Sequence, residues 1–232
     1  MTTIYYLPKG APEFPSAELA LTEPDGLLAM GGDLNCEWLT EAYSKGIFPW
    51  FNSDEEEILW WCPSQRAVIR PGTMRISKSF NKLVRKDNFS VSFDNYFDEV
   101  IDNCSIRNDE SEGTWITERM KKAYKELHAV GLAHSVEVKL DDMLVGGLYG
   151  VSLGKMFFGE SMFSRVSNAS KIALYHLQRK LLEWQFSLID CQIMNPHLNS
   201  LGATNISRKQ YIDIINANPL AKTKKGNWST TI

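Results

Sequence analysis

The chain contains no run of about 20 apolar residues, which is the length that an α-helix needs to cross a lipid bilayer. Its N-terminus also lacks the positively charged segment followed by an apolar segment that marks a secretory signal peptide. From these two absences we expect a cytoplasmic protein that does not insert into membranes.

Cysteine and histidine are both scarce, with four residues of each. No CxxC pair is present, which favours reduced thiols over a disulfide framework. The cysteines are Cys36, Cys62, Cys104 and Cys191. The histidines lack the spacing of metal ligands, so we expect no metal site. They are His128, His134, His176 and His197.

An excess of positive charge is absent as well. The chain has 25 Lys and Arg against 28 Asp and Glu, which gives a net charge of −3. Any contact with nucleic acid must therefore come from a local basic patch. The length of 232 residues and the hydrophobic fraction of 44% are ordinary for a globular protein with a full core, built as one large domain or two smaller ones.

The distribution of turn-forming residues divides the chain into two unequal parts. Residues 1–65 are rich in Pro and Gly and predict short strands and loops, with one helix over residues 37–44. The periodic elements are longer from residue 66 onward. There the predicted helices span residues 74–85, 116–130 (with Thr117 as N-cap), 169–184 and 207–217. The predicted strands span residues 134–139, 144–152, 155–163 and 187–192.

Acidic side chains interrupt two of these apolar strands. Because side chains alternate along a strand, Asp190 and Gln192 should share one face, and Glu160 should share a face with Phe158 and Met162. A helix connects the two strands, so we expect them to be parallel. Burying a charge is costly unless it is paired, and the residues alone leave two interpretations open: a network that holds the sheet together, or a working site.

Blocks of sequence along most of the chain resemble the leucyl/phenylalanyl-tRNA–protein transferase family and occur in the family's order. They include residues 26–34 (GLLAMGGDL), 42–51 (AYSKGIFPWF), 159–164 (GESMFS), 188–192 (LIDCQ) and 197–203 (HLNSLGA). The resemblance implies an α+β fold with a small N-terminal α/β domain over residues 1–65. It also implies a C-terminal GNAT-like (acyl-CoA N-acyltransferase-like) domain over residues 66–232, with a mixed sheet flanked by helices.

The resemblance further implies an aminoacyltransferase that moves Leu or Phe, and Met less well, from aminoacyl-tRNA to the N-terminal Arg or Lys of proteins, marking them for degradation. Such aminolysis of an ester is downhill, and no GxxxxGK[ST] phosphate loop is present, so we expect no cofactor. We expect a monomer. The family implies three catalytic roles. Gln192 contacts the attacking amine through its side-chain oxygen, and Asp190 polarises the side-chain amide of Gln192. Glu160 positions the amine and the basic N-terminal residue of the acceptor.

The resemblance also assigns binding residues. The pocket for the aminoacyl side chain corresponds to Leu148, Phe157, Met162, Leu174 and Leu177, which ordinary core packing would also explain. The terminal adenosine of the tRNA is assigned to Trp50, Trp115, Tyr124 and Tyr43, for which buried structural aromatics are the alternative. The acceptor stem is assigned to a basic cluster that could equally be a solvated face: Arg75, Lys78, Lys82, Arg85 and Lys86. Weaker candidates for the same role are Lys222, Lys224 and Lys225.

Two other classes of function remain open. An acetyl-CoA-dependent N-acetyltransferase would share the C-terminal sheet, but it should carry a glycine-rich pyrophosphate loop before the helix, and residues 164–169 (SRVSNA) contain no glycine. An RNA-binding module without catalysis would explain the aromatic and basic residues, but it leaves Glu160, Asp190 and Gln192 without a purpose.

Overall fold

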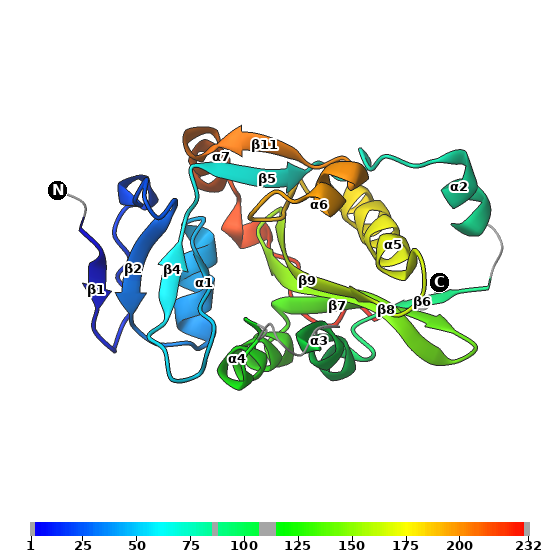
Figure 1. Ribbon diagram of the computed structural model, residues 1–232, viewed down its shortest axis with the longest axis horizontal. Helices are drawn as coiled ribbons and strands as arrows, with labels where there is room; N and C mark the ends of the chain where they lie inside the picture. Colours follow the sequence, from blue (N-terminus) through cyan, green and yellow to red (C-terminus); the bar gives the residue numbers. More distant parts are fainter. Residues whose placement is uncertain (1–2, 85–87, 107–114, 230–232) are drawn as a thin grey trace.

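The structure is a computed structural model, and it describes residues 3–84, 88–106 and 115–229. Two β-sheets lie side by side, with about the first quarter of the chain in one and the rest in the other (Figure 1). The first sheet has the order β1-β2-β4-β3. Its strands are β1 (Tyr5–Leu7), β2 (Leu27–Gly31), β3 (Phe48–Pro49) and β4 (Leu59–Trp61). Helix α1 (Cys36–Ser44) follows β2 and confirms the helix predicted there.

The second sheet has seven strands in the order β11-β5-β10-β9-β8-β7-β6. The central strands are β7 (Ala133–Leu140), β8 (Met143–Leu153), β9 (Met156–Ser164) and β10 (Leu188–Asp190). The outer ones are β5 (Gln65–Ile69), β6 (Ser90–Phe93) and β11 (Thr204–Ser207). The predicted antiparallel order of β7, β8 and β9 is confirmed, and so is the parallel pairing of β9 with β10.

Helices cover both faces of this sheet (Figure 1). Helix α5 (Ala169–Glu183) packs on one face, while α3 (Phe97–Ser105) and α4 (Glu118–Ala129) pack on the other. The short helices are α2 (Lys78–Val84) and α6 (Pro196–Leu201), and α7 (Arg208–Asn216) follows β11. The predicted cap of α4 is confirmed, because the Thr117 hydroxyl accepts a hydrogen bond from the Met120 amide at 3.3 Å.

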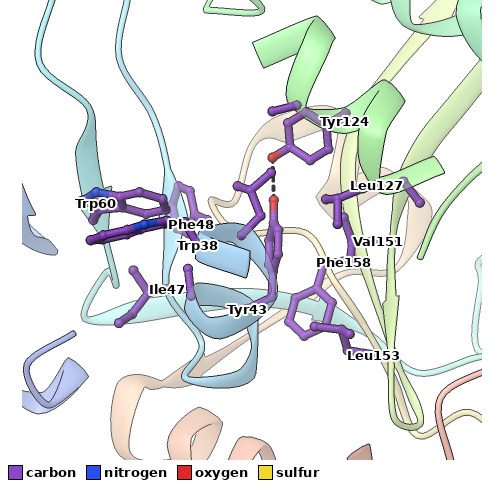
Figure 2. Close-up of a cluster of buried hydrophobic side chains, with 14 of the residues drawn as sticks. Trp38, Tyr43, Ile47, Phe48, Trp60, Tyr124, Leu127, Val151, Leu153 and Phe158 are labelled. Atoms are coloured by element: carbon purple, nitrogen blue, oxygen red, sulfur yellow. Dashed lines mark hydrogen bonds between the residues drawn. The ribbon is translucent and has the colours of Figure 1, made fainter. Parts of the chain in front are cut away.

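The core is continuous across the two sheets. One buried cluster joins Trp38 and Trp60 of the N-terminal part to Tyr124, Val151 and Phe158 beside the second sheet. Figure 2 shows the rings of Tyr43 and Tyr124 pointing toward one another at the centre of this cluster. The change from one sheet to the other falls between Trp61 and Gln65, and the division into a domain over residues 1–65 and another over residues 66–232 stays a prediction.

Two predicted elements have other bounds than expected. The helix predicted from residue 74 begins only at Lys78, because the Arg75 amide donates to Leu201 O at 3.0 Å and the Ser77 hydroxyl accepts from the Phe80 amide at 3.1 Å. The predicted end of that helix at Arg85 lies outside the described residues. The strand predicted to reach residue 192 ends at Asp190.

The predicted alternation along β9 is wrong because a β-bulge interrupts it. Gly150 pairs with Gly159 and Tyr149 pairs with Ser161, so Glu160 has no partner on β8. The extra residue brings Phe157 and Met162 to the side of α5, while Phe158 packs in the core on the opposite face. Among the described helices, none is long and apolar enough to cross a membrane.

Candidate active site

A cavity of about 440 Å³ opens where β9 and β10 separate. The two strands pair only as far as Phe158 and Asp190, and the residues that follow on both strands line the cavity. Polar groups on its wall come from Glu160 of β9 and from Gln192, which follows β10. Because the two strands separate there, the carboxylate of Glu160 faces the cavity.

One wall of the cavity is apolar. All five residues that the sequence assigned to the aminoacyl side-chain pocket lie on it: Leu148, Phe157, Met162, Leu174 and Leu177. Four of them are buried, and Met162 is half-buried. Ile189 and Leu198 complete this wall. A wall of this kind suits an uncharged aliphatic or aromatic side chain, and the assignment to the aminoacyl group stays a prediction.

Glu160 accepts hydrogen bonds from three side chains. The Tyr43 hydroxyl donates to Oε1 at 2.7 Å, the Tyr124 hydroxyl donates to Oε2 at 2.8 Å, and Gln192 Nε2 donates to Oε1 at 3.1 Å. The two tyrosine hydroxyls also contact each other (Figure 2). Tyr43 comes from α1, Tyr124 from α4 and Gln192 from the segment after β10. Three parts of the chain that are distant in sequence therefore hold one carboxylate.

Burial raises the pKa of Glu160 to about 7, although the hydrogen bonds from Tyr43 and Tyr124 oppose this rise. The negative charge of Asp190 adds to the rise, and the positive charge of Arg66 reduces it. Burial also raises the pKa values of Tyr43 and Tyr124 well above the usual value, with a further contribution from the charge of Glu160. Both hydroxyls therefore stay protonated at neutral pH, and Glu160 is the group that titrates there.

Asp190 lies behind the cavity in a buried ion pair with Arg66. Arg66 donates from Nε to Oδ1 at 2.8 Å and from Nη2 to Oδ2 at 2.7 Å, and both side chains are fully buried. The Tyr211 hydroxyl donates to Oδ2 at 2.7 Å. The guanidinium carbon lies over the rings of Phe48 and Tyr211, at 4.6 and 4.5 Å from their centroids. Burial alone would lower the pKa of Arg66, but the charge of Asp190 raises it overall.

The prediction that Asp190 and Gln192 project together is wrong, because Gln192 lies beyond the strand in a left-handed conformation with φ of 54°. Its amide N–H donates to Asp190 Oδ1 at 2.9 Å, while its side chain turns to Glu160. The segment is also tied to β5, since the Ala67 amide donates to Gln192 O at 3.0 Å and the Cys191 amide donates to Ala67 O at 2.8 Å. Asp190 thus fixes the turn that aims Gln192.

Sequence reasoning missed Arg66 and Tyr211. Arg66 stands at the start of the apolar run Ala67, Val68 and Ile69, and a lone arginine in such a run needs a buried acid. The unpaired acid in the strand that ends at Asp190 was the available partner. Only the order of the strands, in which β5 lies beside β10, brings the two together.

The aromatic residues assigned to the terminal adenosine fall into two groups. Trp50 and Trp115 line the cavity, and Trp50 is 39% exposed. Tyr43 and Tyr124 are fully buried and contact the cavity through Glu160. The adenosine role stays a prediction for all four. The hydroxyls of the two tyrosines also hold the Glu160 carboxylate.

Three residues of the predicted acceptor-stem patch are described, and Arg75, Lys78 and Lys82 are all exposed. Arg85 and Lys86 lie outside the described residues. Lys222, Lys224 and Lys225 are placed near the C-terminal end of the described chain, and Lys224 Nζ lies 4.3 Å from the ring centroid of Trp184. Within the described parts of the chain, no group of three or more His, Cys, Asp or Glu could hold a metal ion.

The family models and the curated relatives that match this chain carry the same description. The family described as leucyl/phenylalanyl-tRNA protein transferase matches residues 68–216, and the family of its N-terminal domain matches residues 32–64. Curated relatives called leucyl/phenylalanyl-tRNA–protein transferase include one from Hydrogenovibrio crunogenus, 54% identical over 87% of this chain and 79% of the relative. Another, from Azoarcus sp., is 50% identical over 95% of this chain and 93% of the relative.

Among solved structures, L-PGS from Bacillus licheniformis matches with a TM-score of 0.40 and 11% sequence identity. The match covers 73% of this chain and 54% of that protein. A likeness at this level carries no argument about fold or function.

Proposed function

The chain belongs to the leucyl/phenylalanyl-tRNA–protein transferase family, and from this premise we propose that it transfers leucine or phenylalanine, and methionine less well, from aminoacyl-tRNA to the N-terminal Arg or Lys of acceptor proteins. The α-amine of the acceptor attacks the carbonyl carbon of the aminoacyl ester. A peptide bond forms, and the ester bond to the 3′-oxygen of the terminal adenosine breaks. The reaction needs no ATP, because aminolysis of an ester is downhill.

The observation that carries this proposal is a single cavity in which an apolar wall meets a carboxylate and an amide. The apolar wall from β9 and α5 accepts the leucyl or phenylalanyl side chain. Glu160 and Gln192 lie on the same cavity, where an incoming amine would meet the ester. Holding the two reactants in one cavity converts a bimolecular step into an effectively unimolecular one, and well-oriented pairs gain about 7–11 kcal/mol from this effect.

The acceptor amine is received by Gln192 and Glu160. Gln192 donates a hydrogen bond from Nε2 to Glu160. The side-chain oxygen of Gln192 is therefore free to accept a hydrogen bond from an N–H of the amine. Glu160, when ionised, attracts the positive charge of an N-terminal Arg or Lys residue. An uncharged or acidic N-terminal residue gains nothing from that carboxylate, so the pair supports selection of basic acceptors.

Asp190 supports the site by holding the backbone of Gln192 in place. Its oxygens are taken up by Arg66, Tyr211 and the amide N–H of Gln192, so its charge fixes the backbone from which Gln192 reaches the cavity. This differs from a polarising contact between the Asp190 carboxylate and the Gln192 side chain. Gln192 in turn orients the amine, because a neutral amide is too weak a base to remove its proton.

The tRNA is held at its 3′ end, which lets the enzyme use several tRNAs. Trp50 and Trp115 line the cavity and would stack on the terminal adenine, while Tyr43 and Tyr124 hold Glu160 on the same cavity through their hydroxyls. The exposed residues Arg75, Lys78 and Lys82 attract the phosphates of the acceptor stem.

Several finer assignments belong to the same proposal. The C-terminal part is a GNAT-like domain, supported by a mixed sheet that splits between two parallel strands joined by α5. The protein acts as a cytoplasmic monomer. Its product, a protein with a new N-terminal Leu or Phe, enters the N-degron pathway and is degraded.

The test is a transfer assay with radiolabelled Leu-tRNA and a protein that begins with Arg. Acid-precipitable label that depends on the N-terminal Arg supports the proposal, and the matched control is the same protein with its N-terminus acetylated. Absence of label with any acceptor would refute it. Label delivered from acetyl-CoA in place of Leu-tRNA would point to an N-acetyltransferase, and tRNA binding without transfer would point to an RNA-binding module.

A further inference from the structure

The first step concerns which carboxylate can reach a substrate. Asp190 is fully buried, and its two oxygens accept four hydrogen bonds from Arg66, Tyr211 and the Gln192 amide. Asp190 does not line the cavity, and these donors occupy its oxygens. Glu160 is the carboxylate that lines the cavity among the described residues.

The second step concerns the hydrogens around Glu160. Three oxygen-to-oxygen contacts form a closed ring: Tyr43 to Oε1, Tyr124 to Oε2, and Tyr43 to Tyr124. The two tyrosine hydroxyls supply two hydrogens, and a hydrogen bond needs one hydrogen for each contact. A proton on Glu160 supplies the third, and without it one contact of the ring has no hydrogen. The ring is therefore a place where a proton can be received and given up with little movement of heavy atoms.

We propose that Glu160 carries the proton in peptide-bond formation, taking it from the attacking α-amine and returning it to the 3′-oxygen of the departing adenosine. This inference rests on the proposed transferase function. The amine nitrogen forms a bond to the carbonyl carbon and loses one hydrogen to the Glu160 carboxylate. The carbon–oxygen ester bond then breaks. The protonated Glu160 side chain gives the same hydrogen to the leaving 3′-oxygen. The enzyme ends the cycle in its starting state.

The surroundings of Glu160 suit this role on every side. Tyr43 of α1 and Tyr124 of α4 donate to it, and Gln192 donates from the segment after β10. Asp190 of β10 and Arg66 of β5 act on it through their charges in opposite directions. The remaining neighbour is Tyr149 of β8, whose buried hydroxyl has no hydrogen-bond partner among the described residues. The balance holds the pKa of Glu160 at about 7, near the operating pH, where proton transfer in both directions is efficient.

The experiment measures single-turnover transfer from Leu-tRNA to an Arg-peptide between pH 5.5 and 9, a range that brackets neutrality by roughly 1.5–2 units on each side. Wild-type rates should rise through a midpoint near 7, as Glu160 becomes a carboxylate. Glu160→Gln keeps the size of the side chain but accepts no proton. It should lose about 10²–10⁴-fold in rate, which is the usual contribution of general acid–base catalysis. It should still bind Leu-tRNA.

The acceptor's own α-amine titrates at about 7.7–8.0, so a second set of variants separates the two groups. Tyr43→Phe and Tyr124→Phe each remove a hydrogen bond that favours the ionised carboxylate. The midpoint should therefore move to higher pH, so that these variants are slow at pH 7 and recover at pH 9. Tyr149→Phe is the matched control, because its hydroxyl makes no bond to Glu160, and the midpoint should stay where it is.

A measurement without turnover keeps this inference separate from the transferase proposal. The carbon-13 signal of the Glu160 carboxyl, identified by its loss in Glu160→Gln, should titrate near pH 7 and move upward in Tyr43→Phe. If the wild-type protein transfers leucine and Glu160→Gln transfers it at a rate within threefold of wild type, the inference is overturned. The proposed transferase function would then still hold. A midpoint that follows only the acceptor amine in all variants would overturn it as well.

Discussion

At the scale of single residues, two carboxylates on adjacent strands are held in opposite ways. Asp190 receives a guanidinium, a phenol and a backbone amide, so its charge is fully compensated. Glu160 receives hydrogen bonds from two phenols and an amide side chain, no cation of the described residues contacts it, and burial raises its pKa to about 7. Environment, and not residue type, therefore gives one acid a structural role and leaves the other able to titrate.

Replacement of Asp190 should reduce stability and activity together. Asp190→Asn leaves the Arg66 charge buried without its partner, and breaking a buried ion pair in this way costs about 3–5 kcal/mol. Urea denaturation followed by circular dichroism measures the loss. A variant as stable as wild type but inactive would contradict the structural role of Asp190 and favour a direct chemical one.

Replacement of Gln192 should separate the two properties. Its side chain makes one hydrogen bond with the part of the chain that the structure describes, so Gln192→Ala should change the free energy of unfolding by no more than about 1 kcal/mol. The transfer rate should fall because the amine loses its acceptor, and the fall should appear in kcat more than in the KM for Leu-tRNA. Rates equal to wild type in a folded Gln192→Ala protein would remove Gln192 from the site.

At the scale of elements, the bulge in β9 determines the shape of the cavity. It inserts Glu160 into the strand, and it lets Phe157 and Met162 line the same apolar wall although five positions separate them in the sequence. Gly150 stands opposite the bulge. A Cβ atom there would lie 2.2 Å from Phe158 O and 2.6 Å from the Phe157 ring, so only glycine permits this approach of the two strands.

Gly150→Ala should therefore destabilise the protein by about 1–3 kcal/mol and distort the apolar wall. Gly159→Ala is the matched control on the opposing strand, since its Cβ would find its nearest atom, Asp190 O, at an ordinary 3.5 Å. Thermal unfolding of the two variants measures the difference. Equal melting temperatures for both would show that the strands can separate at Gly150 without cost.

The apolar wall should set the preference between leucine and phenylalanine. Met162 is half-buried at the cavity, so Met162→Phe adds an aromatic ring with little disturbance of the core. Transfer of phenylalanine should fall relative to leucine by about 10-fold, because one side-chain increment in such a pocket is worth about 1–3 kcal/mol. Competition between Leu-tRNA and Phe-tRNA measures the ratio. An unchanged ratio would place the aminoacyl side chain elsewhere.

Periodicity in the sequence was enough to find the strand–helix–strand unit, because residues 133–190 carry long apolar patterns with clear turns. Asp141 and Asp142 adopt the positive φ values, 50° and 63°, that a tight hairpin needs. The bulge was out of reach of the same reasoning, since alternation assumes that each residue has one partner on the neighbouring strand. The Arg66–Asp190 pair was also missed, because it joins positions 124 residues apart that only the strand order brings together.

At the scale of the whole molecule, the site depends on both parts of the chain. Tyr43 and Phe48 come from the N-terminal part, and they contact Glu160 and Arg66 of the second sheet. The shared core around Trp38, Tyr124 and Phe158 fixes this arrangement (Figure 2). The N-terminal part is therefore a structural component of the candidate active-site cavity as well as a candidate surface for the tRNA end.

The distribution of charge predicts how the tRNA binds. The net charge of −3 gives no general attraction to RNA, so we expect binding to depend on a local basic patch, and the exposed cluster of Arg75, Lys78 and Lys82 at α2 is the proposed one. Replacing Arg75, Lys78 and Lys82 together by Ala should weaken binding of Leu-tRNA at low salt. It should also reduce the slope of log K against log salt concentration by roughly 0.7–0.9 for each phosphate that the protein no longer neutralises.

Filter binding at several salt concentrations measures both quantities. Lys9→Ala is the matched control, because Lys9 is exposed and follows β1 in the sequence. Figure 1 shows β1 at the opposite end of the molecule from α2. The slope of Lys9→Ala should equal that of wild type. The triple variant should keep its turnover rate at saturating Leu-tRNA, since none of the three residues lines the cavity. An unchanged slope in the triple variant would assign the acceptor stem to another surface of the protein.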